Sequence, residues 1–109
     1  MNRSAHHESA QLHVQGLASY VDDLPLTEGT LHAAPMLSPN ACGLIEKLDL
    51  RAVLASDGVH TVVTAQDIPG DRLFATFVHD EPVFAAERVD HVGQVLGLVL
   101  ADSHIQARA

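Results

Sequence analysis

The feature that most restricts the fold of this chain is the apolar run QVLGLVLA at residues 94–101. A strand of this kind is apolar on both faces, so we predict that both faces are covered. Asp102 and Ser103 follow as helix-capping residues and open a short final helix over residues 104–109. That helix has only about two turns. It lacks a Gly, Asn or Pro stop signal, so we expect the natural chain to continue beyond Ala109.

The clearest other strand is residues 59–65, which are rich in β-branched side chains. Residues 30–39 predict a strand in which Pro35 requires an edge or a bulge. Residues 41–50 predict a second strand, joined to the first by a hairpin loop at Ser38–Asn40. Residues 12–14 predict a further short strand before a turn at Gly16.

The remaining segments are shorter. Asp49 is expected to cap a helix over residues 50–56, and residues 65–70 are expected to form a helical turn or loop. Residues 71–81 show no regular pattern, and residues 82–92 predict two short strands around a turn at Glu87-Arg88. Strands and helices mix without a regular βαβ rhythm, which favours an α+β domain with a mixed sheet and short helices.

Length and composition predict one folded domain over residues 12–109, preceded by a flexible N-terminal tail over residues 1–11. Hydrophobic residues make up 47% of the chain, enough for a core, but aromatic residues make up only 4%. The core must therefore consist mainly of Leu, Val, Ile and Ala.

The charge balance excludes several classes of partner. Six basic residues stand against fourteen acidic ones, and the net charge is −8. Nucleic acid and anionic membrane surfaces are disfavoured, because phosphate binding needs clustered Lys and Arg. The single cysteine, Cys42, cannot form an internal disulfide, which fits a cytoplasmic location. The N-terminal segment lacks a secretory apolar region, and no run is long enough to span a membrane.

The candidate chemical groups favour structural roles. His6, His7 and Glu8 could bind a metal, but a solvated terminal run is the preferred interpretation. The other histidines form no HExxH motif and no i,i+4 pair. We interpret Cys42 as a small buried hydrophobic residue, since no activating base or helix N-terminus is evident.

Two acidic pairs and one glycine motif also favour structure over chemistry. Asp22-Asp23 and Asp80-Glu81 each precede a proline and predict turns. The stretch Gly93–Gly97 lacks the lysine of a phosphate loop and is better explained by close backbone packing at a bend. We therefore predict no catalytic, cofactor-binding or metal-binding residue in this chain.

Several stretches, taken in order, resemble the molybdenum-binding large subunit of bacterial xanthine dehydrogenases, in the aldehyde oxidase/xanthine dehydrogenase family. They are Glu8-Ser9-Ala10-x-Leu12-His13-Val14-x-Gly16-x-Ala18-x-Tyr20-Val21-Asp22-Asp23, Leu31-His32, Val59–Thr64 with Ala65-x-Asp67-Ile68-Pro69, Asp80-Glu81-Pro82-Val83-Phe84-Ala85, and Val92-Gly93-Gln94. The resemblance covers about nine tenths of the chain, from residue 8 onward. Val95 departs from it, because many relatives have Pro there.

The resemblance implies the N-terminal a/b hammerhead domain of that subunit. It also implies a parent enzyme that oxidises hypoxanthine and xanthine to urate, with molybdenum–molybdopterin, iron–sulfur clusters, FAD and NAD as acceptor. The partners implied are the remainder of the subunit and an iron–sulfur/FAD subunit. The cofactor contacts and the catalytic glutamate would lie beyond residue 109. A further strand would follow the last helix, so the hammerhead would be incomplete at its C-terminal end.

Three interpretations stay open at this point. The chain is a structural domain of a xanthine dehydrogenase, of a relative acting on an aldehyde or another heterocycle, or a free-standing binding module. In the first two, the chain itself is inactive and its role is packing. The candidate structural residues are Gly16, Tyr20, Asp22, Asp23, Gly93 and Gln94.

Overall fold

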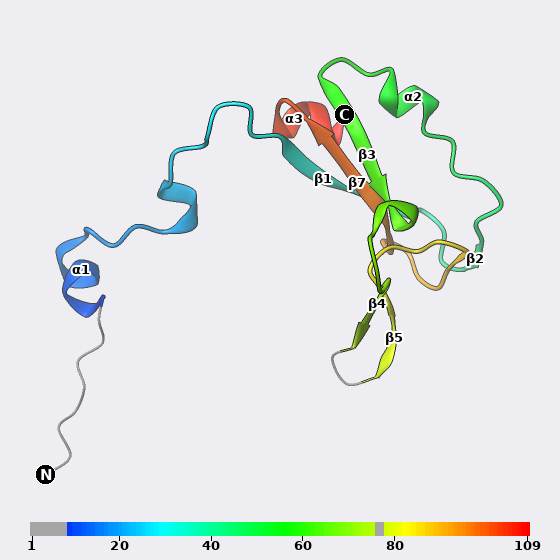
Figure 1. The fold of residues 1–109 in the computed structure, drawn as a ribbon, viewed down its shortest axis with the longest axis horizontal. Helices are drawn as coiled ribbons and strands as arrows, with labels where there is room; N and C mark the ends of the chain where they lie inside the picture. The colour runs from blue at the N-terminus through cyan, green and yellow to red at the C-terminus, as the bar shows by residue number, and fades with distance from the viewer. Residues whose placement is uncertain (1–8, 76–77) are drawn as a thin grey trace, which may run out of the picture.

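The computed structural model describes residues 9–75 and 78–109, and Figure 1 shows their arrangement. The elements in the first half of the chain are α1 (Ala10–Gln15), the 3₁₀ turn η1 (Val21–Asp23), β1 (His32–Leu37), β2 (Gly43–Leu44) and α2 (Arg51–Leu54). They are followed by β3 (Val59–Thr64), the 3₁₀ turn η2 (Ala65–Asp67), β4 (Leu73–Ala75), β5 (His79–Pro82), β6 (Arg88–Val89), β7 (Val95–Ala101) and α3 (His104–Arg108).

The body of the molecule is built on a three-stranded sheet with the order β1-β7-β3. The apolar run at residues 94–101 forms β7, the central strand, as its composition predicts. Both neighbours are antiparallel to it, and Val99 lies opposite Ala34 of β1 and Val62 of β3. The predicted α+β class is confirmed. The expectation of a mixed sheet is wrong, because all the strand pairings among the described residues are antiparallel.

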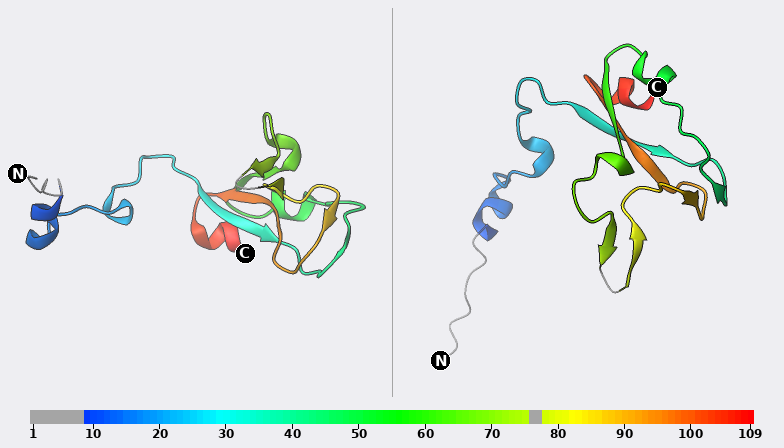
Figure 2. Two further views of the ribbon diagram at one scale, coloured as in Figure 1. Left: turned by 90° about the horizontal axis from the view of Figure 1, so that it is seen from below. Right: turned by 45° about the vertical axis from the view of Figure 1, so that its right-hand side comes forward.

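The core lies between this sheet and α3. Successive side chains of a strand point to opposite faces, and in β7 the alternate residues Gly97, Val99 and Ala101 are buried. Ala101 and Ala34 pack with Ala107 of α3, and these small side chains let the helix approach the sheet closely. Figure 2 shows α3 on one face of β1 and β7.

The opposite face of the sheet is covered less well than predicted. Leu98 and Leu100 of β7 are only half-buried there, and Val63 of β3, directly opposite Leu98, is half-buried too. We expected both faces of β7 to be covered. Among the described residues only the face toward α3 is fully covered. We call the surface formed by Val63, Leu98 and Leu100 the open face.

The two edge strands behave as their sequences indicate. Pro35, which has no N–H to donate, lies in β1 at the edge of the sheet, and the register shifts between Met36 and Leu37. The β-branched run at residues 59–65 forms the other edge strand, β3. Both predictions are confirmed.

Three strand predictions are wrong. Residues 41–50 contain only the two-residue strand β2, which pairs with β6 and not with β1, so the predicted hairpin is absent. Residues 12–14 lie in helix α1, which ends at Gly16 with a left-handed backbone (φ 70°). Of residues 82–92, only Pro82, the last residue of β5, and Arg88–Val89 (β6) are in strands.

Residues 71–81 are more regular than predicted. β4 and β5 pair as an antiparallel ribbon, which we call the hairpin (residues 73–75 and 78–82), and it projects from the body in Figure 1. Asp80 and Glu81 therefore lie in a strand and not in a turn. The helical turn at residues 65–70 is confirmed as η2. The helix expected over residues 50–56 is present but shorter, as α2.

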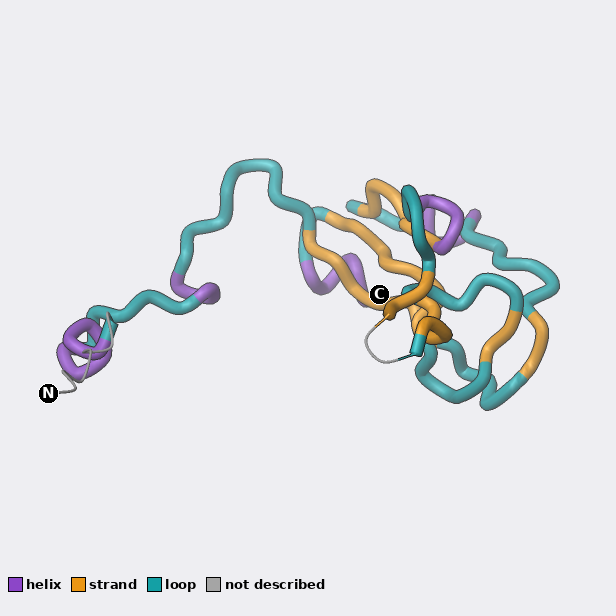
Figure 3. The backbone as a smooth tube through the Cα atoms, turned by 60° about the horizontal axis from the view of Figure 1, so that its bottom comes forward, coloured by secondary structure: helices purple, strands orange, loops and turns teal. Residues whose placement is uncertain are grey.

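Residues 9–31 form an extended arm that leads away from the body before β1 begins (Figure 3). Because of it the radius of gyration is 19.8 Å, against roughly 13 Å for a compact chain of this length. No residue of the arm is buried. The predicted tail, residues 1–11, lies mostly outside the described residues.

Candidate docking surface

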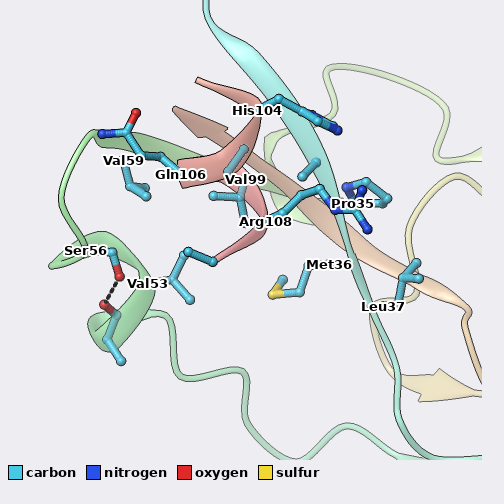
Figure 4. Close-up of a pocket in the computed structure, with 14 residues that line it drawn as sticks. Pro35, Met36, Leu37, Val53, Ser56, Val59, Val99, His104, Gln106 and Arg108 are labelled. Carbon is cyan, nitrogen blue, oxygen red and sulfur yellow. Dashed lines mark hydrogen bonds between the residues drawn. The ribbon is translucent and has the colours of Figure 1, made fainter. Parts of the chain in front are cut away.

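A groove of about 680 Å³ lies beside the core. Its floor is formed by β1 and β7, and its sides are formed by α2 and α3. Figure 4 shows the side chains of Met36, Val53 and Val99 toward its apolar part and Arg108 at α3. The described residues that line it are mainly apolar, and Arg108 is the one cationic side chain among them.

The hairpin presents a second apolar surface. Leu73, Phe74 and Val78 are 39%, 50% and 66% exposed, although apolar side chains of this size usually lie in a core. Asp71 Oδ2 pairs with His79 Nε2 at 2.8 Å across the ribbon, and the Leu73 N–H donates to Asp71 Oδ1. The hairpin thus presents apolar side chains on its surface.

Two carboxylates hold the chain where it leaves β3 and where it enters α2. Asp67 accepts hydrogen bonds from the Thr64 N–H at 2.7 Å and the Thr64 hydroxyl at 2.9 Å. These bonds, the backbone one first, lower the pKa of Asp67. Asp49 accepts from the Arg51 guanidinium and then from the Arg51 N–H, and both lower the pKa of Asp49. The structure places the helix cap at Leu50, although Asp49 still binds the first helical N–H as predicted.

The predicted structural residues fall into two separate groups. In the arm, the Tyr20 N–H donates to Asp23 Oδ2 at 2.9 Å, and Gly16 ends α1. Asp22-Asp23 lie in η1, so a turn at this point is confirmed.

Gly93 and Gln94 lie in the loop before β7. The Gly93 N–H donates to Ser38 O and the Ser38 N–H donates to Gln94 O, which fastens the end of β1 to this loop. Gln94 Oε1 also accepts from the Asp90 N–H at 2.7 Å. The arm and this loop lie far apart in Figure 1, so the predicted residues do not form one site.

The described residues supply no cluster of metal-ligating side chains. Among residues 9–75 and 78–109 there is no group of three His, Cys, Asp or Glu side chains placed to hold a metal. His6, His7 and Glu8 lie outside this range. His60 pairs with Asp102 at 2.7 Å, but both side chains are more than half exposed and the pair joins the ends of two strands. Cys42 is exposed, so its interpretation as a buried residue is wrong.

Three residues have structural roles that we did not expect from the sequence. Ser38, which we expected in a hairpin loop, is a buried polar residue directly after β1. Thr64 and Asp67 form a capping box, and the signal Thr-x-x-Asp was present in the sequence. Across the part of the chain that the structure describes, no helix has the length and apolarity needed to cross a bilayer.

Comparison with known proteins identifies the class of this domain. Residues 15–109 match the family described as aldehyde oxidase and xanthine dehydrogenase, a/b hammerhead domain, and the chain belongs to this family. Its α+β fold with antiparallel sheets is the hammerhead fold.

The chain is similar to curated relatives and to a solved structure, of which three are described. Xanthine dehydrogenase 1 of Arabidopsis thaliana is 43% identical over 94% of this chain and 8% of its own length. Aldehyde oxidase 3 of Rattus norvegicus is 37% identical over 94% of this chain and 7% of its own length. The aldehyde oxidoreductase of Desulfovibrio gigas superposes with a TM-score of 0.79 at 31% identity, covering 93% of this chain and 12% of that one. The chain thus spans less than a tenth of the length of these curated relatives.

Proposed function

We propose that this chain is a structural domain of a molybdenum hydroxylase subunit and that it is not itself a catalyst. The observation that carries this proposal is the apolar surface of the hairpin, where Leu73, Phe74 and Val78 are exposed, together with the open face, which is only partly covered. Exposed apolar patches on a folded domain mark surfaces that contact another protein surface. The small share of the relatives that this chain spans supports the same conclusion, because in them such a domain has neighbours to pack against.

The parent enzyme that we propose oxidises hypoxanthine and xanthine to urate with NAD as acceptor, in the cytoplasm. Its cofactors would be molybdenum–molybdopterin, iron–sulfur clusters and FAD, all bound outside this chain. Its partners would be the remainder of the molybdenum-binding subunit and an iron–sulfur/FAD subunit. Identity to a xanthine dehydrogenase at 43% supports purine as the substrate class.

The second candidate is a parent enzyme that oxidises an aldehyde or another heterocycle. The identity of 37% to an aldehyde oxidase and the superposition on an aldehyde oxidoreductase favour it. Residues of this chain do not separate the two, since the substrate pocket would be formed elsewhere. A free-standing binding module is the third possibility, and a stop codon directly after codon 109 would support it.

The first experiment assays the purified chain with xanthine and NAD and measures its molybdenum content. We expect neither urate nor bound molybdenum, because the described residues supply no cluster of metal ligands. The intact parent enzyme is the positive control. Urate formation by the purified chain would contradict the non-catalytic role.

The second experiment tests the packing role with Phe74→Ser, made both in the 109-residue chain and in the intact subunit. In the isolated chain Phe74 is already half exposed, so we expect the substitution to lower the unfolding free energy by only about 1 kcal/mol. In the intact subunit the same substitution should lower the thermal midpoint, because there the ring would be covered. Equal effects in both settings would show that the hairpin meets no neighbour.

A further inference from the structure

The arm, residues 9–31, is an apolar segment that no other part of the described chain covers (Figure 1). The exposed fraction of Val14, Val21 and Leu26 is 85%, 83% and 69%. The exposed apolar set of the arm is Leu12, Val14, Leu17, Tyr20, Val21, Leu24, Leu26 and Leu31. One exposed apolar side chain is ordinary on a protein surface, but a series of this length marks a surface that contacts protein.

Local hydrogen bonds give the arm a definite shape. The Tyr20 N–H donates to Asp23 Oδ2 at 2.9 Å within η1. The Thr30 N–H and hydroxyl both donate to Thr27 O, which forms a turn just before β1. A segment that is shaped before it binds loses less conformational entropy on docking, so the arm is suited to a fixed contact.

The arm takes the same course in a solved relative, the aldehyde oxidoreductase of Desulfovibrio gigas. The body, residues 32–109, is about seven tenths of the chain, so a match over 93% of the chain includes most of the arm. A superposition of the body alone could not score above the body's share of the matched residues, and the TM-score of 0.79 exceeds that share. The extended arm is therefore a feature that the larger relative shares.

The charges of the arm indicate the kind of surface that it fits. Asp22, Asp23 and Glu28 lie in the arm, which contains no Lys or Arg. Among the described residues, the carboxylates of Asp22 and Glu28 make no ion pair, whereas that of Asp23 accepts the Tyr20 N–H. A complementary surface is apolar and carries Lys or Arg side chains at its border, because opposite charges across a contact favour specific pairing.

We propose that the arm lies in an apolar groove with a cationic border on the remainder of its own polypeptide. This inference rests on the proposed function, and it names a surface and a partner for it. In the Desulfovibrio gigas relative the matched part is 12% of one chain, so most of that chain lies outside the match and is covalently joined to the arm. A tethered surface has an effective concentration on the order of millimolar, so it occupies the arm ahead of a second copy or a separate subunit of equal affinity.

The test uses the intact subunit that contains this chain, with Val21 or Leu26 replaced by the photoreactive p-benzoylphenylalanine. We expect irradiation to join the arm to a peptide outside residues 1–109, while the denatured product keeps the mass of one polypeptide. A product of two polypeptides, or a link within residues 1–109, overturns the proposal. So does the absence of a cross-link at both positions, because the probe then faces water. The same subunit unfolded in urea is the control and should lose the cross-link.

Cleavage by chymotrypsin after Tyr20, located by mass spectrometry, measures how firmly the arm is held. In the intact subunit Leu24→Ser/Leu26→Ser should raise the rate of this cleavage, relative to the unfolded subunit, at least about tenfold, because two apolar side chains lose their cover. The control is Leu44→Ser, which alters a side chain 79% exposed in β2 and should leave the rate unchanged. An equal rise in both variants shows that cleavage follows unfolding of the whole domain and overturns the proposal.

Glu28 tests the charge at the border of the groove. Glu28→Lys should raise the rate of cleavage after Tyr20 more than Glu28→Gln does, because lysine is repelled by a cationic border and glutamine is neutral. Added salt should narrow the difference between the two variants. The reverse order of the two rates overturns the cationic border.

These results separate the arm from the proposed function. If Phe74→Ser lowers the thermal midpoint of the intact subunit while the arm forms no cross-link, the domain packs through its hairpin and only the proposal on the arm fails. If the purified chain forms urate, the non-catalytic role fails, whatever the cross-link shows.

Discussion

Gly97 lies at the closest approach between two strands of the sheet. A Cβ placed on Gly97 would stand 2.4 Å from the carbonyl oxygen of Val63. A backbone atom cannot move aside as a flexible side chain does, so the contact admits only glycine. The sequence analysis expected close packing in this stretch and placed it at a bend. The structure places the close approach inside β7 and leaves the turn to Gly93, whose φ is 81°.

We therefore predict that Gly97→Ala destabilises the protein by about 1–3 kcal/mol, the usual cost of overpacking. Urea unfolding followed by circular dichroism measures the change. Gly43→Ala is the matched control, because a Cβ there has no neighbour within 4 Å. If the two alanine variants unfold at the same urea concentration, the contact between Gly97 and Val63 is not a constraint.

Asp67 makes stability depend on pH. Hydrogen bonds from the Thr64 N–H and then the Thr64 hydroxyl lower the pKa of the Asp67 carboxyl below its ordinary value of 3.8. A lowered pKa in the folded state means that the ionised form stabilises the fold. That contribution is complete above the unfolded pKa and is lost as the pH falls through the folded one.

We predict that Asp67→Asn is less stable than the parent at neutral pH and that the difference shrinks as the pH falls below about 4. Denaturant midpoints of both proteins from pH 7 to pH 2.5 test this. The control is Asp57→Asn, since Asp57 is an exposed residue in the turn between α2 and β3. A difference that stays constant over this pH range would contradict the role of the Asp67 charge.

At the scale of elements, α3 covers the sheet and forms one side of the groove. It has five residues and could not persist alone in water. Its N-cap is Ser103, whose hydroxyl oxygen accepts the Gln106 N–H at 3.3 Å, and Ala107 packs against the core. The sequence pattern Asp102-Ser103 indicated this start correctly, and the structure assigns the cap to Ser103.

We predict that Ser103→Ala lowers the free energy of unfolding by about 1 kcal/mol, the common cost of a lost N-cap. Ser103→Thr should retain most of the stability, because threonine keeps the accepting oxygen. Thermal and urea unfolding of both variants provide the measurement. An alanine variant as stable as the threonine one would show that packing of Ala107 alone holds α3 in place.

The elements that the sequence analysis missed share one property, which is the lack of a buried face. In β5, His79, Asp80 and Glu81 are all exposed, so burial imposes no alternation that a pattern could reveal. β2 is exposed as well, and so are the residues of α1. These segments are held by strand pairing, by the Asp71–His79 interaction and by the left-handed cap at Gly16. Hydrophobic periodicity in the sequence predicts none of these three interactions.

At the scale of the whole molecule, the chain divides its apolar residues unevenly. A few small side chains, such as Ala34, Ala101 and Ala107, form a compact core, while many of the larger ones are exposed, most of them on the arm and the hairpin. This distribution is the reverse of an independent globular domain, in which the larger side chains contribute most of the buried area. It is the physical basis for the proposal that the domain packs into a larger subunit.

The sequence by itself determined the α+β class, the strands β7, β3 and β1, the edge position of Pro35 and the capped final helix. Each of these depends on local chemistry or on a face that the fold buries. Only the tertiary structure decided that β7 lies between β1 and β3, that Ser38 fastens the loop before β7, and that the arm stays apart from the body. These are contacts between residues distant in sequence, and their partners are selected by packing, which no local pattern encodes.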